Sequence, residues 1–181
     1  MTTRWSHPDD DALRDLLVTL DASHQVDRAL LEHLTLEMMH AVVPGGGMSV
    51  AQHLAHLLGA TKTWLARLAP DEAVGLPDLF DRDAALEGRA DAFAAETEPA
   101  RVSEVAETIH DALVRTVADA AAVWPGALPH RSITQFVTHM MVHAAHHRGQ
   151  ILLALKASGH PLPDEDAMWQ PWKEAAGERE G

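Results

Sequence analysis

The segment 132–158, SITQFVTHMMVHAAHHRGQILLALKAS, contains four histidines, and two of them, His143 and His147, are four residues apart. Residues four apart on an α-helix lie on one face, so these two imidazoles can be directed at one metal ion. A helical projection places His147 inside the apolar stripe of the segment and His143 at its shoulder. His139 lies near the edge of the stripe, and His146 and Arg148 face mostly away from it. The segment therefore offers two inward-facing histidines.

A third ligand can come from the segment AQHLAHLLGA, in which His53 and His56 are three residues apart. By periodicity His53 lies nearer to the apolar stripe of its segment than His56, and both residues stay open as ligands. Three neutral imidazoles leave coordination positions for water or substrate, which is typical of a catalytic metal centre. Histidine suits Zn²⁺, Ni²⁺, Fe²⁺ or Cu²⁺, and the sequence does not select among them. Such an ion lowers the pKa of a bound water or thiol and so provides a nucleophile near neutral pH.

The alternative is that the histidines have no role in chemistry. The chain contains 13 of them, so a pair spaced by four residues also arises by chance. We interpret the histidines outside the two segments as hydrogen-bonded core residues or as solvated surface residues: His7, His24, His33, His40, His110, His130 and His160. If the same held for all of them, the chain would be a purely structural helical bundle.

Local signals place both histidine segments on long helices. Ser49 with Gln52 forms a capping box that predicts a helix from there to about Leu68, ahead of Pro70. The same spacing recurs in Ser132 and Gln135, where it predicts the start of the histidine helix. That helix is expected to end at Gly159, with Pro161 two residues further on.

Two further amphipathic segments complete the predicted fold. One helix is expected from 9–11 to about 41, before Pro44 and three glycines, and another from the cap Ser103 to about 124. No run alternates with period two, so no strands are expected. We therefore predict an all-α fold, a four-helix bundle, with an extra segment over 70–102 between the second and third main helices. The short first loop predicts antiparallel neighbours, and the 70–102 segment, with a weak helical pattern at 83–96, could cross over the bundle.

The length and composition favour one domain over residues 1–181, with a core of about 9–160 and a polar tail over 161–181. In that tail Met168, Trp169 and Trp172 are expected to dock. The chain has 27 acidic and 14 basic residues, a net charge of −13, which makes nucleic acid and membranes poor partners. It has no cysteine, hence no disulfide and no thiolate nucleophile of its own. The first residues show no apolar targeting segment, and we expect a cytoplasmic protein.

The segment HMMVHAAHHRGQILLALKASGHPLPDED, together with SVAQHLAHLLGATKTWL upstream, resembles the DinB/YfiT-like superfamily of four-helix-bundle proteins. The HxxxHRGQ pattern followed by a glycine and a proline-rich turn carries most of the resemblance, which spans roughly 9–166. It implies a divalent-metal protein with a three-histidine site, often a homodimer. Because the family pattern has a histidine directly before a leucine, it implies the ligands His56, His143 and His147, with His53 in reserve.

The resemblance also implies candidate functions. Relatives include thiol-dependent S-transferases and a mycothiol-dependent isomerase, so we expect a candidate metal-dependent enzyme, a hydrolase or thiol S-transferase, in which Zn, Ni or Fe activates water or a low-molecular-weight thiol. Its expected partner is a small-molecule substrate, and that thiol is a candidate cosubstrate. In this context His53, His139 and His146 could shuttle protons or support the ligands. The alternative is a non-catalytic metal-binding stress-response protein, whose ion stabilises the fold by mass action.

Overall fold

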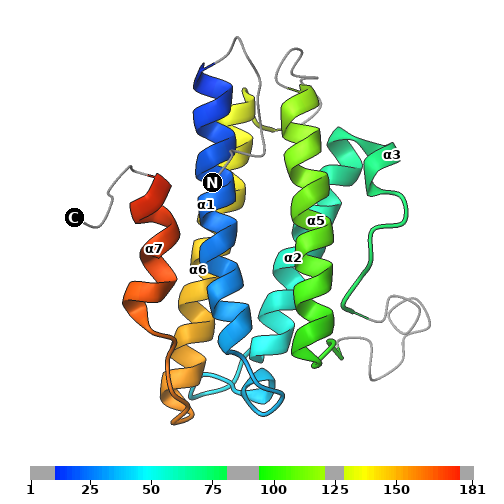
Figure 1. Ribbon diagram of the computed structural model, residues 1–181. Helices are drawn as coiled ribbons and strands as arrows, with labels where there is room; N and C mark the ends of the chain where they lie inside the picture. The colour runs from blue at the N-terminus through cyan, green and yellow to red at the C-terminus, as the bar shows by residue number, and fades with distance from the viewer. Residues whose placement is uncertain (1–10, 81–93, 121–128, 176–181) are drawn as a thin grey trace.

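Four long helices form the body of the protein. The computed structural model describes residues 11–80, 94–120 and 129–175. The long helices are α1 (Asp11–His33), α2 (Val50–Leu68), α5 (Pro99–Ala120) and α6 (Ile133–Ala157) (Figure 1). The shorter elements are the 3₁₀-helix η1 (Met38–His40), α3 (Pro70–Ala73) and α7 (Glu165–Ala175). Within the described ranges there is no strand, only an isolated bridge between Phe80 and Ala95, so the predicted all-α fold class is confirmed.

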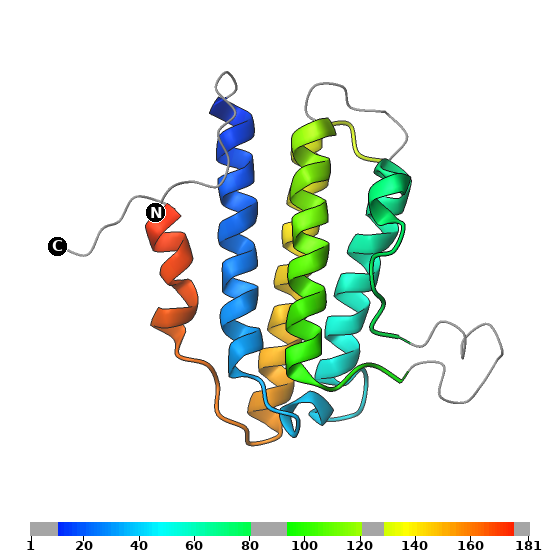
Figure 2. The ribbon, with the colours of Figure 1, turned by 45° about the vertical axis from the view of Figure 1, so that its right-hand side comes forward.

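The helices pack so that α1 and α2 each lie against both α5 and α6. Figures 1 and 2 show that α1 and α2 run in opposite directions, as the short first loop predicts. They are nevertheless not the main neighbours of each other, because α5 and α6 lie between them. The two views also show α2 and α5 running in the same direction. The connection from the end of α2 to the start of α5 therefore has to run back from one end of the bundle to the other. Its number of residues had suggested such a crossover.

Capping explains where the two histidine-bearing helices begin. At α2, Ser49 accepts a hydrogen bond from the backbone N–H of Gln52, and the Gln52 side chain accepts one from the N–H of Ser49, which confirms the predicted capping box. At α6, Ser132 accepts from the N–H of Gln135, but Gln135 accepts from Arg131 instead. This second box is therefore only half formed.

The end of α6 is set by Gly159, as predicted. Its φ is +78°, a left-handed conformation that glycine adopts without steric penalty. The N–H groups of Gly159 and His160 then bond to the carbonyls of Lys156 and Leu155, at 3.2 and 3.0 Å. These two bonds satisfy carbonyls that the helix end would otherwise leave without partners.

Two predicted helix bounds need correction. The first helix was expected to reach about 41, but α1 ends at His33. Beyond it, the Thr35 hydroxyl accepts from the N–H of Met38 at 3.4 Å, an alternative to helical bonding that leads into η1. The third helix begins at Pro99, four residues before the expected cap Ser103, because proline suits the first helical position. Its predicted end near 124 and the weak helix at 83–96 lie largely outside the described residues.

The tail after 160 is more ordered than its polar composition suggested. It forms the eleven-residue α7, which packs along α1. Asp164 caps this helix by accepting from the N–H of Ala167 at 2.8 Å. Of the three residues expected to dock, Met168 is buried and Trp169 is 38% exposed.

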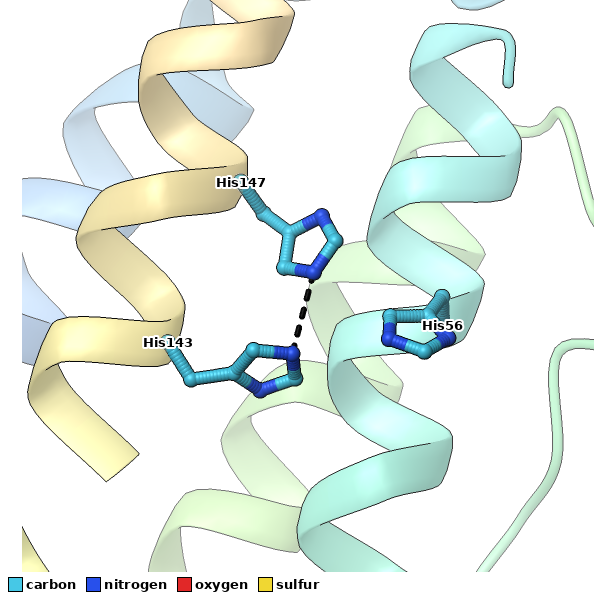
Figure 3. A group of neighbouring side chains, drawn as sticks. All are labelled: His56, His143 and His147. Carbon is cyan, nitrogen blue, oxygen red and sulfur yellow. Dashed lines mark hydrogen bonds between the residues drawn. The ribbon is translucent and has the colours of Figure 1, made fainter. Parts of the chain in front are cut away.

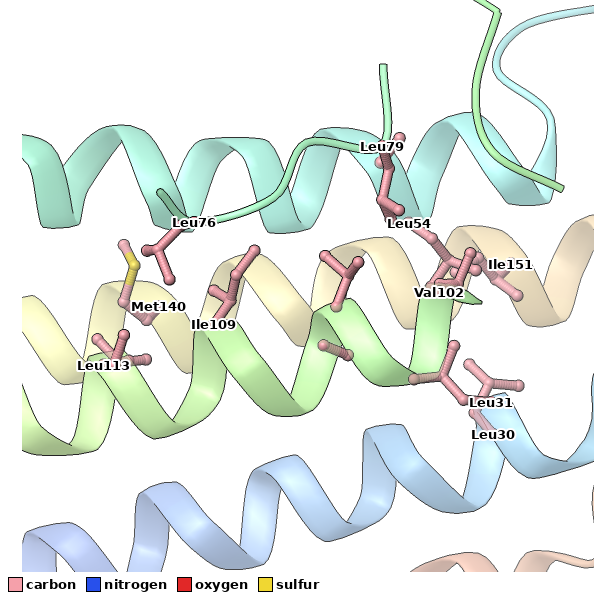
Figure 4. Packing of buried hydrophobic residues seen from close by; sticks show 14 of the residues in the cluster. Leu30, Leu31, Leu54, Leu76, Leu79, Val102, Ile109, Leu113, Met140 and Ile151 are labelled. Carbon is pink, nitrogen blue, oxygen red and sulfur yellow. The ribbon is translucent and has the colours of Figure 1, made fainter. Parts of the chain in front are cut away.

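The core runs the length of the bundle and includes part of the extra segment. Leu76 and Leu79, which follow α3, are buried against the long helices. Lys62 of α2 fixes this segment by donating to the Leu76 carbonyl and, at 2.8 Å, to Asp78. Figure 4 shows the packing, with these core residues labelled: Leu30, Leu31, Leu54, Leu76, Leu79, Val102, Ile109, Leu113, Met140 and Ile151. No helix among the described residues is long and apolar enough to span a bilayer.

Candidate metal centre

Two neighbouring helices, α2 and α6, bring three histidines together. His143 and His147 lie one helical turn apart on α6, and His56 faces them from α2 (Figure 3). Each offers one ring nitrogen such that all three nitrogens lie within 4.8 Å of one another. The ring centroid of His56 lies 5.4 Å from that of His143 and 4.8 Å from that of His147. Among the described residues, this is the group of histidine and carboxylate side chains that could hold a metal ion.

The two ring nitrogens of His147 have different partners. Its Nε2 lies 3.0 Å from Nε2 of His143, the contact drawn in Figure 3. Its Nδ1 lies 2.9 Å from Nδ1 of His53. His53 is therefore on the far side of the His147 ring from His143, and the structure groups His56 rather than His53 with the α6 pair. The role of these residues as ligands stays a prediction.

Burial increases across the group: His56 is exposed, His143 is half-buried and His147 is buried. Burial is the main reason that the pKa of His147 is lowered from 6.5 to about 4, and the nearby His143, His56 and His53 add to the effect. Burial also lowers the pKa of His143, with His56 the next cause. Both imidazoles are thus neutral near pH 7, the protonation state in which a histidine binds a metal.

The donor set fits a divalent ion. Three neutral nitrogens bind zinc at about 2.0–2.1 Å, which puts tetrahedral ligand nitrogens about 3.3 Å apart. The His143–His147 separation of 3.0 Å is close to this value. The largest separation in the group is at most 4.8 Å, somewhat longer than the tetrahedral value. With three ligands, such a site keeps a position for water or substrate.

Other histidines predicted to support the site lie beside it. The exposed His146 has its ring centroid 5.1 Å from that of His147. His139, one turn before His143, lies 6.2 Å from it by ring centroids, and its Nδ1 is 2.9 Å from Nε2 of His130. We interpreted His130 as having no role in the site, but its ring contacts that of His139, which in turn lies near His143. His130 precedes α6 in the chain, and no local sequence signal links it to His139.

Arg148 corrects the helical projection. It was expected to face mostly away from the bundle, but it is buried and pairs with Asp27 of α1. Its guanidinium also lies 5.8 Å from the ring centroid of Trp169 on α7. A buried arginine requires such a partner, and the partner comes from a helix more than a hundred residues earlier.

A comparison with models of protein families shows to which family the chain belongs. The model described as DinB family matches residues 11–180. The chain belongs to the DinB family. Searches of curated proteins and of solved structures return no match. In this DinB protein the match includes both histidine-bearing helices and also α7, so the family region extends beyond the 9–166 that the sequence resemblance suggested.

Proposed function

We propose that this DinB protein binds one divalent metal ion through His56, His143 and His147 and acts as a metal-dependent enzyme. The single observation that carries the proposal is the convergence of three imidazole nitrogens, from two helices, within 4.8 Å of one another. An ion held there would supply Lewis-acid chemistry and activate water or a low-molecular-weight thiol for hydrolysis or S-transfer. Zinc, nickel and iron all suit the donor set.

The exposure of His56 supports access to this centre. A structural metal is usually enclosed by four protein ligands, whereas this group has three, and the outermost is exposed to solvent. A small molecule can therefore approach from the side of His56. The low-molecular-weight thiol would have to come from outside the protein, because the chain contains no cysteine.

The chain's own residues can orient the ligands. When Nε2 of His147 faces the centre, Nδ1 carries the proton and donates to Nδ1 of His53, which must then hold its own proton on Nε2. This hydrogen bond fixes the tautomer and the ring orientation of His147. The neighbouring His146 is exposed, and its imidazole is within reach of solvent for proton exchange.

Turnover by the metal-loaded protein tests the proposal. The untagged protein, loaded in turn with zinc, nickel or iron(II), is assayed with a panel of small thiols and electrophiles and with activated esters. We expect turnover by the wild type and its loss in His143→Ala. His40→Ala, which removes an exposed histidine outside the group, is the matched control and should stay active. Equal turnover by wild type and His143→Ala would contradict the enzymatic role, and metal binding with thermal stabilisation but no turnover would favour the non-catalytic alternative.

A further inference from the structure

A partly open pocket lies among the four long helices, close to the three histidines but separate from them. It has a volume of about 70 Å³ and is lined by side chains from all four long helices. A second pocket of about 50 Å³ lies beside it. The two linings share five residues: His24, Asp27, Leu57, Leu58 and Ala106. The shared walls place the two partly open pockets side by side.

The first pocket begins within one helical turn of the candidate metal centre. On α6 it is lined by Met140 and Ala144, which lie three residues before His143 and His147, respectively, and so close to them on the helix surface. On α2 it is lined by Leu57, the residue after His56. Figure 4 shows Met140 among the buried apolar side chains that α5 and α6 direct into the core.

The walls are mainly apolar, and their polar groups include two stacked histidines. His24 of α1 and His110 of α5 stack with ring centroids 3.8 Å apart and an interplanar angle of 5°. Their Nε2 atoms lie 3.2 Å from Glu107 and 3.4 Å from Asp21, respectively. Two charged imidazolium rings would repel each other at this distance. Burial and then the neighbouring His110 lower the pKa of His24 to about 3, so its ring is neutral near pH 7.

The one pair of formal charges on the walls is already matched. Arg148 donates to Asp27, and both line the second pocket. Burial raises the pKa of Asp27, and the Arg148 guanidinium opposes that rise. A charged ligand would have to lose its hydration without finding a free counter-charge here, which is strongly unfavourable. An apolar ligand would meet aliphatic side chains and the neutral ring of His24.

We propose that this pair of pockets binds the apolar body of one small, uncharged organic molecule, about the size of a single six-membered ring. A cavity needs only about 10–15 Å³ to hold one water, and apolar cavities of about 150 Å³ bind benzene. The two pocket volumes, about 70 and 50 Å³, lie between these limits and suit a compact ligand. The role of that molecule as a substrate rests on the proposed function, whereas its binding does not require the metal.

The test uses the full, metal-free chain and two near-isosteric probes, benzyl alcohol and benzoate. Methyl NMR of labelled methionines reports the site directly, because Met140 and Met141 line the first pocket while Met38 and Met168 are buried elsewhere. We expect saturable shifts at Met140 and Met141 with benzyl alcohol and an affinity for benzoate at least about tenfold lower. No saturable shift, shifts of equal size at Met38 and Met168, or equal affinity for both probes would overturn the inference.

A pocket-filling variant adds a second test. Ala106 lines both pockets from α5, so Ala106→Leu should weaken benzyl alcohol binding about tenfold or more. Ala66→Leu makes the same change at an exposed position of α2 and should leave the affinity unchanged. If Ala106→Leu unfolds, the methionine shifts of the wild type still decide the question. A separate zinc titration keeps the two proposals apart: zinc binding without benzyl alcohol binding overturns this inference alone, and the reverse result overturns the proposed function alone.

Discussion

The imidazoles of His53 and His147 meet through their Nδ1 atoms at 2.9 Å, although they belong to different helices and lie 94 residues apart in the chain. This contact occupies the ring nitrogen of His147 that does not face His143. It links the orientation of the most buried histidine of the candidate centre to a side chain on α2. His53 thereby has a defined place beside the predicted ligands.

Removal of His53 should weaken metal binding without abolishing it. Hydrogen bonds from outside the ligand set fix the tautomer of a ligating histidine, and their loss typically costs about 10–100-fold in metal affinity. We expect this loss in His53→Ala, measured by zinc competition with a chelator. His40→Ala is the control and should bind as the wild type does. An unchanged affinity in His53→Ala would show that the contact has no such role, and complete loss of binding would indicate that His53 is itself a ligand.

Acid should destabilise the metal-free protein through His24. Its pKa is about 3 in the folded state and 6.5 as the reference value, because the ring is buried against His110. The unfolded chain then binds a proton that the folded chain does not, so this contribution to stability is complete above about pH 6.5 and is lost as the pH falls toward 3. The free energy of unfolding should decrease by up to about 1.4 kcal/mol per pH unit for this proton.

The variant His24→Gln tests this assignment. Glutamine cannot titrate, so the slope of the unfolding free energy between pH 6 and 4, measured by urea denaturation, should fall by about one proton. The absolute stability is expected to decrease as well, because the stacking on His110 is lost. His40→Gln, at an exposed position, serves as the control. A slope as steep in His24→Gln as in the wild type would contradict the explanation.

Breaking the buried ion pair between Arg148 and Asp27 should destabilise the bundle strongly. Arg148→Ala leaves a largely buried carboxylate without its partner, which costs about 3 kcal/mol. It also removes the contact with Trp169, so α7 should loosen on α1. Chemical denaturation measures the loss of stability, and hydrogen exchange in α7 measures the loosening of that helix.

A double variant provides the control for this pair. If the loss comes from the unpaired carboxylate, Asp27→Leu combined with Arg148→Met should recover much of the stability, because apolar residues of similar size often replace a buried pair without loss. Additive losses in the double variant would show that the two residues act independently of each other.

The parts of the fold that depend on neighbouring residues in the chain could be predicted from the sequence. Ser49 with Gln52 and the glycine at 159 fix helix ends through bonds within a few residues, and the structure has both ends as expected. The same kind of signal was present at Asp164, which caps α7, but the polar composition of the tail concealed the helix. For this helix, the capping residue was thus a better predictor than the polar composition of the tail.

Features that depend on distant parts of the chain could not be predicted in this way. The burial of Arg148 depends on Asp27, a side chain of α1 that lies far away in the sequence. Periodicity correctly placed His53 nearer the core than His56. It could not show that a buried ring would approach Nδ1 of His147, while the more exposed His56 would join the other two rings.

The metal content of the purified, untagged protein tests the central claim most directly. Elemental analysis after growth in medium containing zinc, nickel and iron should find about one divalent ion per chain in the wild type. The same analysis should find almost none in His143→Ala and His147→Ala, provided that both variants retain the helical circular dichroism of the wild type. A folded wild type without a stoichiometric ion, or an ion content that neither substitution changes, would contradict the account.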